Sequence, residues 1–80
     1  MKTQKLNTTR VSPPQELLDS LLGHYQNGRF SDAEKLSVKI TQGFPKHQFA
    51  WKVLGAILGA TGRMSEAADA NQTAVVLSPE

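Results

Sequence analysis

Three glycines near the middle of the chain are spaced in a way that suggests a phosphate-binding loop. They are Gly55, Gly59 and Gly62. A phosphate loop ends in lysine followed by serine or threonine and comes after a strand, which supplies its frame. Neither feature is present here. The glycines are better explained by close helix contact and by a helix end.

Acidic residues and a histidine offer a second route to chemistry. Asp32 and Glu34 are two positions apart, Glu66 follows a later turn, and His24 stands beside Tyr25. The acids fall in predicted first helical turns, where they complement the helix dipole. His24 has no nucleophile or orienting acid placed to work with it. The sequence therefore predicts no catalytic residues, and the chain is not expected to be an enzyme.

Metal and cofactor sites are also not expected. The chain has no cysteine, and its two histidines, His24 and His47, lack a second ligand at metal spacing. The absence of cysteine fits a reducing compartment, and no signal peptide or membrane-spanning segment is predicted. We expect a cytoplasmic protein with no metal, no cofactor and no membrane partner.

The net charge of +2 is unevenly distributed. Residues 1–12 contain three basic residues and no acid, whereas residues 13–80 contain six basic and seven acidic residues. A nucleic-acid-binding domain needs a basic face on its folded part. The charge pattern therefore predicts a disordered basic tail over 1–12 and no nucleic-acid partner.

The first apolar stretch predicts a helix that begins near Ser12 and ends at Asn27-Gly28. Ser12 is expected to cap it, Pro13 to occupy the first helical position, and Gln15 to complete a capping box. Glycine adopts the left-handed conformation that ends a helix without strain. The apolar stripe of this helix consists of Leu17, Leu18, Leu21, Leu22 and Tyr25.

Three more helices follow from the same reasoning. The second is predicted from Ser31, in a capping box with Glu34, to Gly43, with Pro45 preventing continuation. The third runs from about residue 47 to 61 and the fourth from 65 to about 77. No segment alternates like a strand. The inward residues are expected to be Ala33, Leu36, Ile40, Trp51, Leu54, Ile57, Leu58, Ala67, Ala70, Ala74 and Leu77.

An internal repeat organises these helices. A shift of 34 residues aligns residues 28–33 with 62–67 and Pro45 with Pro79. A repeat of this period is typical of stacked helical hairpins. The second copy resembles the tetratricopeptide repeat family, and the first matches it again at Tyr25, Phe30 and Ala33. The matching positions of the second copy are Trp51, Leu54, Gly55, Leu58, Gly62, Ala67, Ala74 and Pro79.

The resemblance implies an all-α fold of four helices in two antiparallel hairpins, a fragment of an α-solenoid with repeats 14–47 and 48–80. It also implies a concave groove lined by the first helix of each repeat. Lys52 stands where chaperone-binding members carry a clamp lysine, but Ala56 replaces their asparagine. The expected groove is apolar with one cation. Its residues are Gln15, Leu18, Leu22, Tyr25, Phe49, Lys52 and Ala56.

Such a groove suits a partner helix or an apolar peptide segment, so we expect a protein-interaction module without catalysis. The alternative is an N-terminal substrate-recruiting module of a larger glycosyl-, sulfo- or methyl-transferase. Two repeats leave the final helix without a neighbour on one side. We therefore also expect a homodimer through that helix, with Ala68, Val75 and Val76 at the contact, unless the chain is a piece of a longer repeat array whose next repeat covers it.

Overall fold

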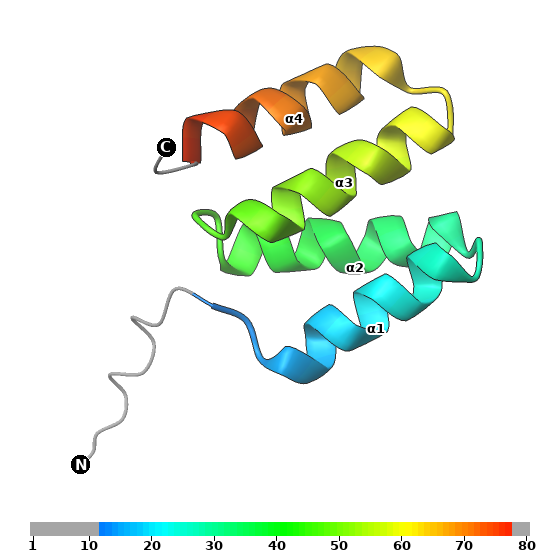
Figure 1. Cartoon of the computed structure of the whole chain (residues 1–80), viewed down its shortest axis with the longest axis vertical. Helices are drawn as coiled ribbons and strands as arrows, with labels where there is room; N and C mark the ends of the chain where they lie inside the picture. Colours follow the sequence, from blue (N-terminus) through cyan, green and yellow to red (C-terminus); the bar gives the residue numbers. More distant parts are fainter. Residues whose placement is uncertain (1–11, 78–80) are drawn as a thin grey trace.

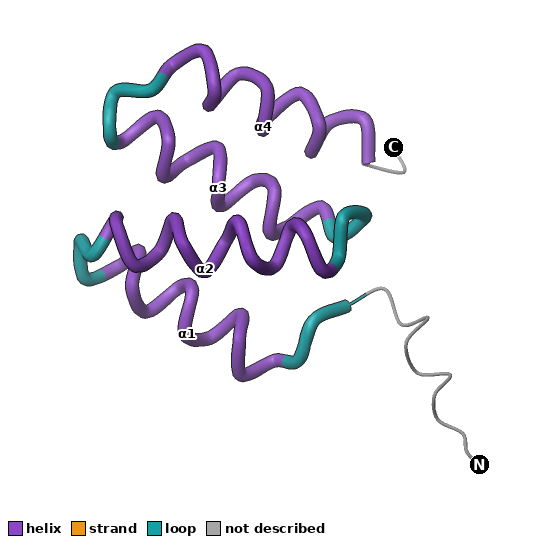
Figure 2. The backbone as a smooth tube through the Cα atoms, turned by 180° about the vertical axis from the view of Figure 1, so that it is seen from behind, coloured by secondary structure: helices purple, strands orange, loops and turns teal. Residues whose placement is uncertain are grey.

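The computed structural model describes residues 12–77, and the chain in this range forms four helices. The predicted disordered tail lies almost wholly outside the described residues. The helices succeed one another as a stack of antiparallel neighbours (Figure 1). In the view from behind, α2 lies nearer the viewer than α1 and α3 do (Figure 2). The bounds are α1 Gln15–Gln26, α2 Phe30–Gly43, α3 Gln48–Ala60 and α4 Met64–Leu77.

Each hairpin is closed by a glycine in the left-handed conformation. Gly28 has φ of 75° and Gly62 has φ of 83°. After α1, the N–H of Gly28 donates to the carbonyl of Tyr25, and the N–H of Arg29 donates to that of His24. This pair of bonds is the Schellman motif, which satisfies carbonyls left free at a helix end. The predicted helix ends at these glycines are confirmed.

The second turn repeats the first, bond for bond. The N–H of Gly62 donates to Gly59, and that of Arg63 donates to Leu58 over 2.9 Å. These residues stand 34 positions after their counterparts in the first turn. The period seen in the sequence is therefore also a period of the backbone hydrogen bonds.

The predicted start of the first helix is wrong by two residues. Helix α1 begins at Gln15, with Pro14 before it at φ −56° and ψ 142° and with no side-chain cap. A residue that precedes proline is pushed out of the helical region, so Pro13 cannot begin the helix. Ser12 is left outside the helix, and the Pro14 carbonyl instead accepts from Leu17 at 3.0 Å.

The predicted capping box of the second helix is also wrong. Helix α2 begins at Phe30, directly after Arg29, and no side chain caps it. Because the Schellman turn passes straight into the helix, Ser31 already lies inside the first turn. Glu34 faces away from the helix start and accepts two hydrogen bonds from Arg63, at 2.6 and 2.7 Å.

The first core cluster joins three helices. Leu21 of α1, Ala33 and Ile40 of α2, and Ile57 of α3 are 0–1% exposed and pack together. Residues of both hairpins thus share one apolar interior. Because a hairpin of this size cannot bury its apolar face alone, this shared interior makes the two repeats one folding unit. Ala50 and Val53 of α3 complete the cluster.

The second cluster combines leucines of α3 with alanines of α4. Leu54 and Leu58 of α3 pack against Ala67 and Ala70 of α4. Alanines allow the two helices to approach closely, and this is the most extensive helix contact of the fold. Trp51, expected in the core, is half-buried at the edge of the cluster. Its indole N–H donates to the carbonyl of Pro45 at 2.8 Å, which is the partner that a buried indole needs.

Gly55 has a specific packing role on this contact. A Cβ at position 55 would collide with the side-chain amide of Asn71 on α4. Gly55 therefore makes room for the Asn71 side chain, and the atom that comes closest is an amide oxygen rather than backbone of α4.

Arg63 ties the two hairpins together on the surface. Its guanidinium bonds to Glu34 of α2 at 2.6 Å and to Glu66 of α4 at 2.8 Å. The hydrogen bond from Arg63 holds the pKa of Glu66 below its usual range. All three side chains reach solvent, so screening limits their contribution to stability. Their main effect is to fix how the second turn sits on α2.

The turn geometry makes a prediction about two glycines. Gly62→Ala should lower the free energy of unfolding by about 1–2 kcal/mol, because a Cβ strains the left-handed backbone. Gly43 is the matched control, since it ends α2 without a positive φ and has open space around its Cα. Gly43→Ala should leave stability unchanged or raise it slightly. Urea unfolding of both variants measures the difference, and equal effects would contradict this account.

Candidate functional site

The predicted groove residues of α1 all keep some exposure. Gln15 is exposed, and its amide donates to Asp19 one turn later at 3.0 Å. Leu18 and Leu22 are half-buried. Tyr25 is half-buried as well, with its ring 5.8 Å from that of Phe30. The two leucines thus present apolar surface while their neighbours form the core.

The predicted residues of α3 are more exposed. Phe49 is 38% exposed, and Lys52 and Ala56 are exposed on the following turns. The ring of Phe49 meets that of His47 edge-on, with centroids 6.4 Å apart. His47 is the residue before the helix, and its Nδ1 accepts from the N–H of Ala50 at 3.3 Å. The hydrogen bond that caps α3 therefore also orients the His47 ring beside Phe49.

The two helices that carry these residues lie on the same side of the molecule. In Figure 1 α1 and α3 lie in front of α2, and Figure 2 shows the reverse from behind. They also pack into the same core cluster. Leu18 and Leu22 stand 34 residues before Lys52 and Ala56, so both pairs occupy the same register in their repeats. We call the surface formed by these two helices on the side facing away from α2 the α1/α3 face.

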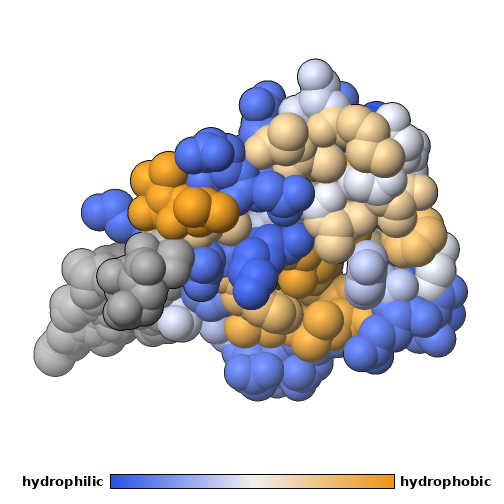
Figure 3. All heavy atoms as spheres, turned by 45° about the horizontal axis from the view of Figure 1, so that its top comes forward, coloured by the Kyte–Doolittle hydropathy of each residue, from blue (hydrophilic) through white to orange (hydrophobic). Residues whose placement is uncertain are grey.

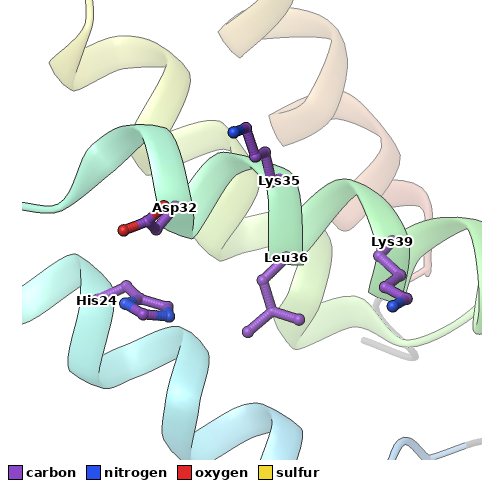
Figure 4. Close-up of a pocket in the computed structure, with 5 residues that line it drawn as sticks. All are labelled: His24, Asp32, Lys35, Leu36 and Lys39. Atoms are coloured by element: carbon purple, nitrogen blue, oxygen red, sulfur yellow. The ribbon is translucent and has the colours of Figure 1, made fainter.

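A depression of about 460 Å³ lies elsewhere, between α1 and α2. Figure 4 shows Leu36 pointing toward α1 and Lys35 pointing away from it, with His24 and Asp32 near one end. Sequence reasoning missed this grouping because it depends on how α1 packs against α2. The signal that predicts it is the helical spacing of Asp32, Lys35, Leu36 and Lys39 on one face of α2.

A second depression of about 400 Å³ is lined by Ser31, Glu34, Lys35 and Val38. It lies beside the carboxylate that binds Arg63. Neither depression contains a residue of the predicted groove. Each combines a carboxylate with at least one lysine, and neither contains a thiol or an unpaired buried acid that would act as a nucleophile or base.

Within residues 12–77, a metal site would need several His, Cys, Asp or Glu side chains close together. This range contains no group of three His, Cys, Asp or Glu side chains placed to hold an ion. None of the four helices in the same range has the length and apolar content that crossing a membrane requires.

Comparison with known proteins does not assign a family. No family model matches the chain, no curated protein matches it, and no solved structure matches its fold. The interpretation of the α1/α3 face therefore rests on the residues and geometry described above.

The cap of α3 predicts a pH dependence of stability. Burial lowers the pKa of His47 from its ordinary value of 6.5, so the unfolded chain takes up a proton first as the pH falls. The free energy of unfolding should therefore be highest above pH 6.5 and decrease as the pH falls from about 7 toward the lower pKa of the folded chain. Protonation of Nδ1 also removes the acceptor for Ala50.

His47→Asn is the matched variant, because asparagine caps helices well and does not titrate. Thermal unfolding of both proteins between pH 8 and pH 5 should show a smaller decrease for the variant. A decrease of the same size in both proteins would show that another group is responsible.

Proposed function

We propose that this chain is a two-repeat tetratricopeptide-type module that binds a partner helix or an apolar peptide segment on the α1/α3 face. The 34-residue repeat of hydrogen bonds at Gly28 and Gly62 supports the repeat assignment. The cysteine-free sequence supports a cytoplasmic setting for this interaction.

One observation carries the binding proposal. Leu18 and Leu22 of α1, together with their counterparts Lys52 and Ala56 of α3, stay accessible. Leu21, on the next position around α1, is fully buried. The two helices thus expose matching positions while using their other faces for the core. Accessible leucines on one of two helices that lie on the same side of the molecule suit the apolar side of an amphipathic helix.

Two further side chains define what the partner should offer. Phe49 keeps 38% of its surface exposed at the start of α3, and an exposed aromatic of this kind is a typical binding anchor. Lys52 follows three residues later and is exposed. A bound segment should therefore place apolar side chains over Leu18 and Leu22 and an acidic group near Lys52.

We also infer self-association through the outer side of α4. Ala68, Val75 and Val76 are exposed, the two valines at 66% and 70%. Figure 3, which brings the α4 end of the molecule forward, shows apolar atoms exposed on this side. A contact with a second protein surface would remove these apolar side chains from water.

Photo-crosslinking tests the α1/α3 face. A p-benzoylphenylalanine at position 22 should form adducts with bound proteins in a cell extract. The same probe at Gln42, which is exposed on α2, is the control and should form few. Equal adduct patterns from both positions would reject the assignment of the face.

A second variant tests the apolar character of the face. Leu22→Glu should weaken capture of the crosslinked partner about tenfold or more, because a carboxylate would have to be desolvated on binding. Gln42→Glu should leave capture unchanged. Circular dichroism of both variants confirms that they remain helical, so a loss of capture reports on the face and not on folding.

A further inference from the structure

The internal repeat allows α4 to be compared with a helix whose neighbours are known. Helix α2 occupies the same place in the first hairpin that α4 occupies in the second, and α2 is covered by α3. Ser37 and Thr41 of α2 are 0% and 5% exposed. Their counterparts 34 residues later, Asn71 and Val75, are exposed, Val75 at 66%. α4 therefore has surface that a helix covers in α2.

This surface forms a continuous line. Met64 is 64% exposed and Ala68 is exposed, and both lie on α4 in register with Asn71 and Val75. Positions 64, 68, 71 and 75 follow steps of four, three and four residues, which places them on one side of a helix. We call Met64, Ala68, Asn71 and Val75 the open strip.

Val76 does not belong to the open strip. Its counterpart in α2 is Gln42, which stays exposed even though α3 covers its neighbours. A helix that packed on α4 as α3 packs on α2 would therefore leave Val76 in solvent. The open strip therefore differs from the residue set expected from the sequence, which included Val76 and omitted Met64 and Asn71.

The first helix of another copy cannot cover the open strip in the way that α3 covers α2. Helix α3 presents Ala50, Val53 and Ile57 to the first hairpin. The counterparts of Ala50 and Val53 in α1 are Glu16 and Asp19, both exposed carboxylates. Burying these two carboxylates, for which residues 12–77 supply no cationic partner, against an apolar strip is strongly unfavourable. Head-to-tail stacking of copies is therefore blocked at the α1 end.

We propose that the open strip pairs with the open strip of a second copy about a twofold axis. This proposal rests on the self-association proposed above. In an antiparallel pair of α4 helices, Met64 lies opposite the partner's Val75, and Ala68 lies opposite the partner's Asn71. Ala68 then meets the partner's Asn71 at the centre, where the Asn71 amide also lies against Gly55 of its own α3, and larger apolar side chains meet at both ends. The strip carries no charge, so the symmetric contact brings no like charges together.

The contact should be weak. Helix α4 has 14 residues, about 21 Å of length, and one helix pair buries less than the roughly 1,600 Å² of a standard interface. The expected dissociation constant therefore lies in the micromolar range, which sedimentation at high-micromolar concentration detects. The dimer should not grow into larger oligomers through this contact, because the pair uses the open strip of both copies.

Sedimentation of the full chain at several concentrations tests the strip. The wild type should be a concentration-dependent dimer, Val75→Lys should be monomeric, and Val76→Lys should behave like the wild type. The two valines have the same chemistry and similar exposure, so each controls for the other. Monomeric wild type up to high micromolar would overturn both the self-association and the strip. Loss of the dimer in Val76→Lys but not in Val75→Lys would overturn the strip alone.

Engineered cysteines test the symmetry, since the chain has none of its own. Mixing Met64→Cys with Val75→Cys under mild oxidation should give a disulfide-linked dimer, whereas neither variant alone should. Disulfide dimers of Met64→Cys alone would indicate parallel helices and overturn the antiparallel arrangement. A Met64→Cys/Val75→Cys double variant that gives a ladder of higher oligomers would overturn the closed twofold. None of these measurements involves the α1/α3 face, so their results do not depend on whether that face binds a partner.

Discussion

The packing of α2 against α3 is the contact on which the rest of the structure depends. Ile40 and Ile57 meet there, both almost without exposure, and they join the two hairpins into one interior. Without this contact each hairpin would expose its apolar side, since a pair of short helices buries too little surface to be stable. The position of α1 relative to α3, and hence the α1/α3 face, follows from it.

The two ends of the stack differ because the repeats carry different residues at matching positions. Helix α1 ends the stack with Glu16 and Asp19, which water solvates well. The outer side of α4 carries Met64 and Val75, which are apolar and poorly solvated by water. Within residues 12–77, the outer side of α1 therefore carries carboxylates and the outer side of α4 carries exposed apolar side chains. An array of repeats normally needs a polar outer surface at both ends to stay soluble.

The two proposed surfaces differ in chemical character and lie on different helices. The α1/α3 face presents leucines with one nearby lysine and suits an apolar partner that carries an acidic group. The open strip is uncharged and suits a copy of itself. Because they use different helices, binding of a partner and self-association are compatible, and a dimer would present two α1/α3 faces to partners with more than one binding segment.

The sequence by itself determined the four helices, their glycine turns, the 34-residue period and nearly all of the buried stripe, because these depend on residues close together in the chain. Tertiary structure decided what depends on distant residues. Glu34 was expected to cap its own helix, but Arg63, 29 positions away, binds it. Whether Val75 or Val76 belongs to the open strip was likewise not visible in the sequence, because exposure depends on which helix covers the neighbouring positions.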